Sequence, residues 1–159
     1  MKTKNPIIIP LLALIMMIGV VPAISQDKPA DNMQIVREKI RADKKLFIAE
    51  NMQLTEGEAK VFWPIYESYQ KDLITLNDRT IKLIKDYARN YQTMSDSVAK
   101  KLVDEYMAIE GDRLKLRQAY LPKLRKVLPE KKVARYYQLE NKIQAAVNYE
   151  LAAEIPLVR

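Results

Sequence analysis

The sequence contains no histidine and no cysteine, and only 3 of its 159 residues are glycine. Without histidine, the chain lacks the general base of Ser-His-Asp and Cys-His sites and the imidazole ligand of zinc sites. Without cysteine, it has no disulfide framework and no thiolate metal site. So few glycines also argue against a glycine-rich nucleotide-binding loop. We therefore predict a protein that is not an enzyme and that binds no cofactor.

The acidic residues do not predict a metal site either. They occur in pairs such as Asp104 and Glu105, on segments with helical periodicity, where carboxylates are usually solvated. Calcium needs several oxygen ligands gathered on one loop, and the sequence has no such loop. Apolar residues make up 48% of the chain and charged residues 30%, which is the composition of a folded protein whose size fits one domain.

Residues 1–25 have the features of a signal peptide. Two lysines precede an apolar run over residues 7–21, and the small residues Ala23 and Ser25 follow at the positions that a signal peptidase recognises. We predict cleavage after Ser25 and a periplasmic location. A retained membrane anchor is the alternative, but the apolar run is short for a helix that spans a bilayer, which takes ~20 residues.

After a short linker over residues 26–31, the sequence predicts a single all-helical domain over residues 32–159. No segment alternates apolar and polar residues with period two, so we expect no β-sheet. Apolar residues recur instead at helical spacing in four segments. These are residues 32–50, residues 56–92, a segment that follows the N-cap Ser95, and a segment from Pro129 to Pro156. A tight turn joins the two long central segments, which predicts an all-α fold: a long antiparallel helical hairpin with flanking N- and C-terminal helices.

The start of the second helix carries a capping-box pattern. Thr55 precedes Glu58 by three residues, so the Thr55 hydroxyl is expected to accept a hydrogen bond from the Glu58 amide. The Glu58 carboxylate is expected to accept one from the Thr55 amide in return. Pro129 opens the fourth helix, where proline is favoured because the first helical amide has no intrahelical partner. Both helix starts are therefore defined by the sequence.

Polar residues interrupt the apolar faces of both hairpin helices near their middles. On the second helix these are Gln70, Asn77 and Thr80, and on the third they are Glu110, Arg113 and Arg117. In an antiparallel hairpin the two sets come to lie opposite one another. We predict a polar layer that fixes the register of the hairpin. A polar cleft that binds a ligand is the alternative.

The hairpin has broader apolar faces than two helices cover, which predicts a homodimer or a monomer with an exposed binding patch. Residues 113–135 hold nine basic residues and one acidic residue, spread around the polar side of the helices. This distribution is typical of a solvated face. We expect no nucleic-acid partner for an exported protein, whereas an anionic membrane surface or an acidic client protein stays open.

The pattern Leu54-Thr55-x-x-Glu58, followed by a long amphipathic hairpin, resembles the LTxxQ-motif periplasmic proteins, the Spy/CpxP-like family. Leu128 and Pro129 begin a second copy of the pattern, with lysine at its last position. The resemblance implies an all-α, cradle-like antiparallel dimer that acts as an ATP-independent chaperone or as an envelope-stress regulator. The zinc-responsive relatives use histidine ligands, so no zinc site is expected in this chain.

These observations lead to a functional hypothesis. We expect a periplasmic chaperone-like binding protein that holds unfolded or stress-exposed client proteins without ATP. Basic side chains would speed capture by long-range attraction, and aromatic and methionine side chains would supply adaptable contacts. The candidate client-binding residues are Arg37, Lys44 and Phe47, on a first helix whose narrow apolar seam is expected to dock onto the domain or onto anionic membrane. The alternative is a signalling or structural envelope protein that binds one folded partner or the membrane surface.

Overall fold

The computed structural model describes residues 29–158, and within the first described helix it describes side chains from residue 41 onward. The predicted signal peptide over residues 1–25 lies outside the described residues, as does the linker up to residue 28. None of the helices in the described range combines the length and the hydropathy that a membrane span requires.

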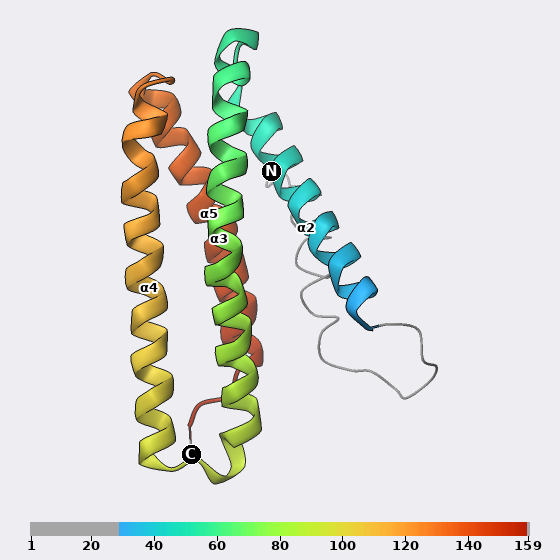
Figure 1. Cartoon of the computed structure of the whole chain (residues 1–159), viewed down its shortest axis with the longest axis vertical. Helices are drawn as coiled ribbons and strands as arrows, with labels where there is room; N and C mark the ends of the chain where they lie inside the picture. The colour runs from blue at the N-terminus through green and yellow to red at the C-terminus, as the bar shows by residue number, and fades with distance from the viewer. Residues whose placement is uncertain (1–28, 159) are drawn as a thin grey trace, which may run out of the picture. The chain divides into compact units, whose positions relative to one another are not determined.

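Four α-helices and one 3₁₀ turn make up the described chain, and this part of the protein contains no strand (Figure 1). The elements are α2 (Pro29–Met52), α3 (Glu56–Asn90), η1 (Tyr91–Thr93), α4 (Asp96–Arg125) and α5 (Glu130–Glu154). The all-α prediction is therefore confirmed. Some boundaries differ from expectation: α2 runs from Pro29, inside the expected linker, to Met52 rather than residue 50, and α3 ends at Asn90 rather than at residue 92. Proline at the start of α2 fits a first helical turn, because the amides there have no intrahelical partner.

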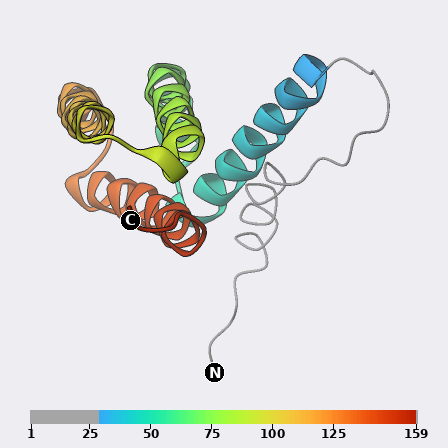
Figure 2. The same ribbon diagram turned by 90° about the horizontal axis from the view of Figure 1, so that it is seen from below.

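The described residues form two compact units. The hairpin unit combines residues 54–134 with residues 156–158, and the α2 unit combines residues 29–53 with residues 135–155. In the hairpin unit, α3 and α4 run antiparallel and lie side by side, joined by η1 (Figures 1 and 2). At the usual rise per residue α3 is about 50 Å long. This is the long helical hairpin that the sequence predicts.

Aromatic side chains form much of the hairpin core. Phe62, Tyr66 and Tyr69 are buried on one face of α3, four and three residues apart, as the helical period requires. Tyr69 meets Tyr120 of α4 edge to face, with ring centroids 5.3 Å apart. Leu124 of α4 is also buried. The two helices therefore share an apolar core in this part of the hairpin.

The α2 unit contains fully buried side chains, and its first helix ends at a residue with positive φ. Ile48 and Met52 on α2 are fully buried, as is Tyr136 on α5. Gln53, which follows α2, has a positive φ of 52° that ends the helix. The Arg135 guanidinium donates a hydrogen bond of 2.7 Å to the side-chain oxygen of Gln53, which holds the turn against α5.

Candidate functional site

The first copy of the sequence motif forms the capping box that its spacing predicts. Thr55 lies in extended backbone just before α3, and its amide donates to a Glu58 carboxylate oxygen at 2.8 Å. The Glu58 amide donates in return to the Thr55 hydroxyl at 3.3 Å. Two backbone donors that would otherwise lack partners at the helix start are thereby satisfied. Leu54, the leading residue of the motif, is half-buried.

The second copy of the motif meets the first in space. Lys132, at the last position of the second copy, forms an ion pair with Glu58, at the last position of the first. The hydrogen bond from Lys132 is the main reason why the pKa of Glu58 lies below its usual value, and the capping bond from the Thr55 amide adds to it. Leu128 is buried, and the Pro129 carbonyl accepts the first backbone bond of α5, from Lys132 at 2.8 Å. The two helix starts of the hairpin unit are thus joined by their own motif residues.

The predicted polar layer brings three of its residues together around one arginine. Arg113 is 7% exposed, and its guanidinium lies 3.4 Å from the Asn77 side-chain oxygen and 3.5 Å from the Thr80 hydroxyl. Its Nε lies 3.7 Å from the Glu110 carboxylate, one turn back on α4. Arg117 follows one turn later and is half-buried. These contacts cross the hairpin at mid-length and fit the register that the sequence predicts.

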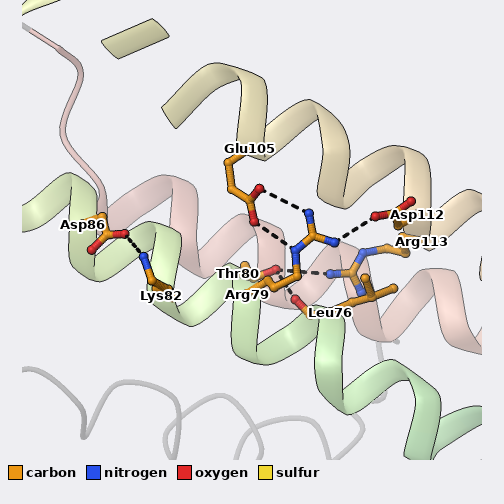
Figure 3. A network of polar contacts seen from close by, with 8 residues as sticks. All are labelled: Leu76, Arg79, Thr80, Lys82, Asp86, Glu105, Asp112 and Arg113. Atoms are coloured by element: carbon orange, nitrogen blue, oxygen red, sulfur yellow. Dashed lines mark hydrogen bonds and ion pairs between the residues drawn. The ribbon is translucent and has the colours of Figure 1, made fainter. Parts of the chain in front are cut away.

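A second polar cluster, which was not predicted from the sequence, lies beside this layer (Figure 3). Arg79 of α3 donates to both Glu105 oxygens, at 2.9 and 3.2 Å, and to Asp112 at 2.8 Å. Figure 3 shows its guanidinium held between these two carboxylates of α4. The hydrogen bonds from Arg79 are the main cause of the lowered pKa of Glu105 and of Asp112. The hairpin pairing that predicts the polar layer places Arg79 opposite the stretch between these residues, so this signal was present in the sequence.

A third cross-hairpin contact lies nearer the open end. The Tyr120 hydroxyl donates to Asp72 at 2.6 Å, and the Lys123 ammonium lies 4.0 Å from the centre of the Tyr120 ring. Burial, with the hydrogen bond to Asp72 as the next cause, raises the pKa of Tyr120 to about 12. The hairpin is therefore tied at three levels by polar groups that mostly bind one another, which is what a register-fixing role requires.

The structure places the candidate client-binding residues of the first helix differently from the prediction. Phe47 is 5% exposed, so it belongs to the packed interior. Lys44 forms an ion pair of 2.8 Å with Glu140, and the two side chains are 13% and 5% exposed. The side chain of Arg37 lies outside the described residues. Lys44 and Phe47 therefore do not offer an open surface, because the apolar seam of an amphipathic helix is the part that packs.

Among the helices of the hairpin unit, α4 carries the most exposed large apolar side chains. Four large apolar side chains there are 54% to 64% exposed, and together they define the α4 stripe: Val103, Tyr106, Met107 and Leu114. Tyr106 and Met107 follow Val103 by three and four residues, and Leu114 follows Met107 by seven. These spacings place all four side chains on one side of the helix. Single exposed apolar residues are ordinary, whereas a row on one helix marks a binding surface. Helical periodicity in the sequence places Val103, Tyr106 and Leu114 on the broad apolar face of the third helix, and it does not distinguish the covered side of that face from its open side.

Neither family models nor curated proteins nor solved structures match this chain. Among the residues that the structure describes, no acidic side chains gather in the threes that a metal ion would need. The α4 stripe and the paired motif are the two features of the described residues that point to binding.

Proposed function

We propose that this chain is a periplasmic, chaperone-like binding protein that holds unfolded client proteins without ATP, and that it is a divergent member of the Spy/CpxP-like family. The family proposal is supported by the paired motif: the two helix starts that carry it are linked through Glu58 and Lys132. A motif that only capped helices would have no need of that contact. The functional proposal is carried by one observation, the exposed α4 stripe.

The chemistry of the stripe suits weak and varied binding. Met107 is flexible and polarizable, and Tyr106 can contact both apolar and polar groups, so the two adapt to unlike sequences. Two exposed lysines of α4 lie at 75% and 77% exposure, and each forms an ion pair along the helix, Lys100 with Asp104 and Lys115 with Asp112. Without residues 1–25, which hold Lys2 and Lys4, the chain has 25 basic and 20 acidic residues and a net charge of +5, so acidic or partly acidic clients are attracted at long range before apolar contacts form.

An aggregation assay tests the proposal. A secreted protein that aggregates on reduction serves as the client, and light scattering is followed with increasing amounts of this chain. We expect suppression by the wild type and a clear loss of suppression in the double variant Met107→Ser with Leu114→Ser. The matched control is Val61→Ser, which removes an exposed valine from α3 rather than from the stripe.

Two results would overturn the proposal. One is the absence of suppression at several-fold excess of the chain over the client. The other is a pull-down from periplasm that yields one folded protein in stoichiometric amount, because this would favour the signalling or structural role that the sequence leaves open.

A further inference from the structure

Met107 is the most exposed side chain of the α4 stripe, at 64% exposure. Its thioether sulfur can take up one oxygen atom and become a sulfoxide. Two other methionines have side chains within the described residues: Met52 is fully buried and Met94 is half-buried. Of these three methionines, Met107 is therefore the one that an oxidant dissolved in water reaches most easily.

Gly111 leaves the surface beside Met107 uncovered. In an α-helix a side chain leans back over the turn that precedes it, so the residue four positions after Met107 would lie over it. That position holds glycine, and a Cβ atom built on Gly111 would meet nothing within 4 Å. A larger residue would fit there, and a glycine in a helix interior costs about 1 kcal/mol relative to alanine. The open position keeps the thioether accessible to small molecules.

Oxidation would change the chemistry of the stripe at its centre, where Met107 lies between Val103 and Leu114. The reaction transfers one oxygen atom from hydrogen peroxide to the Met107 sulfur. The peroxide O–O bond breaks and an S–O bond forms, so the thioether loses two electrons and the peroxide is reduced to water. The sulfoxide is polar where the thioether was apolar, and it therefore favours contact with water over contact with an apolar client segment.

We propose that Met107 is an oxidation site for peroxides, and that formation of its sulfoxide switches off client binding at the α4 stripe. The second part of this inference rests on the proposed function, since it concerns the same surface. The change is reversible, because methionine sulfoxide reductases, one for each epimer, restore the thioether. The stripe holds clients while Met107 is a thioether and releases them once peroxide has converted it.

Peptide mass spectrometry after graded exposure to hydrogen peroxide tests the oxidation site. In the folded chain we expect Met107 to be oxidised about tenfold faster than Met52 or more, because burial keeps the oxidant away from Met52. In denaturant the two rates should converge, which would show that the fold sets the difference. Equal rates for Met107 and Met52 in the folded chain would overturn the inference.

A pair of glycine variants tests the shielding argument. Gly111→Leu should slow the oxidation of Met107, because a leucine that leans back covers the sulfur. The helix itself should be unharmed, since leucine is a better helix former than glycine. Gly57→Leu is the matched control: Gly57 is also helical and its Cβ position is equally open, but it lies on α3. Oxidation of Met107 at the wild-type rate in Gly111→Leu would contradict the role of Gly111.

The aggregation assay tests the switch, with the peroxide removed by catalase before the client is added. The wild type should suppress aggregation before oxidation, lose most of this suppression afterwards and regain it after treatment with both sulfoxide reductases. Met107→Leu should give the same suppression before and after peroxide, whatever its starting level, because it has no thioether at this position. Met94→Leu is the control and should remain as sensitive to peroxide as the wild type.

The outcomes separate the switch from the proposed function. If peroxide lowers suppression by Met107→Leu as much as by the wild type, another residue is responsible and the switch is rejected. If the wild type suppresses aggregation equally before and after oxidation, the switch is rejected while the proposed function stands. If the unoxidised wild type does not suppress aggregation at all, the proposed function and the switch both fail, whereas the mass spectra alone decide whether Met107 is the oxidation site.

Discussion

Glu58 closes the first turn of α3 and at the same time forms an ion pair with Lys132 of α5. One carboxylate therefore caps a helix and ties that helix start to another. The cap requires an acceptor, whereas the ion pair requires a charge. Substitutions can separate these two roles.

We predict that Thr55→Ala lowers the free energy of unfolding by about 1 kcal/mol, because the Glu58 amide loses its cap acceptor. Glu58→Gln should lower the free energy of unfolding less than Glu58→Ala does. Both variants lose the attraction to Lys132, but a glutamine oxygen still accepts a hydrogen bond from the Thr55 amide. Urea unfolding followed by circular dichroism gives the three values. Glu56→Gln is the control, because it removes the same charge from the same turn without touching the cap. A Thr55→Ala variant as stable as the wild type would show that the cap contributes nothing.

The capping box could be predicted because it is local. Thr55 and Glu58 are three residues apart, and the helix itself brings them together, so spacing alone carries the information. The long hairpin follows for a similar reason: sustained helical periodicity on either side of a short turn leaves one arrangement. The cross-hairpin position of Arg113 could then be derived from the length of the turn.

Contacts between distant segments were harder to predict. The pairing of Glu58 with Lys132 depends on how α5 returns to the start of α3, and no periodicity encodes that return. The prediction that Phe47 lies on a client-binding surface was wrong. An apolar residue among basic ones fits both a binding face and a packed seam, so the sequence did not distinguish the two. The burial of Phe47 and the ion pair of Lys44 identify it as part of the packed seam.

Arg113 provides a test of the polar layer. Arg113→Leu removes the contacts to Asn77 and Thr80 and leaves space in the hairpin, so we expect a loss of about 1 kcal/mol in the free energy of unfolding. Lys115→Leu makes a similar change two residues away at an exposed position, and it should alter stability little. Thermal unfolding measures both variants. Unchanged stability in Arg113→Leu would mean that no polar layer holds the hairpin.

The Arg79 cluster predicts a loss of stability in acid. The pKa values of Glu105 and Asp112 are lowered in the folded state, so their contribution is present above the ordinary values of 4.5 and 3.8. It is lost as the pH falls from those values through the lower folded ones. Arg79→Met should therefore flatten the decline of stability with pH in this window, whereas Lys85→Met, an exposed change on the same helix, should not. Stability curves with the same acid slope in wild type and Arg79→Met would contradict the role of Arg79.

The side chains of the ion pair between Lys44 and Glu140 are 13% and 5% exposed, so substitutions of the two residues should have non-additive effects on the free energy of unfolding. Lys44→Met leaves a buried carboxylate without this cation, which should cost about 3 kcal/mol. Replacing both residues by methionine removes the buried carboxylate as well, so most of that loss should be regained. Lys45→Met, the same change at the next and exposed position, is the control. A double variant that is less stable than Lys44→Met alone would mean that the pair stabilises the α2 unit beyond what apolar packing can replace.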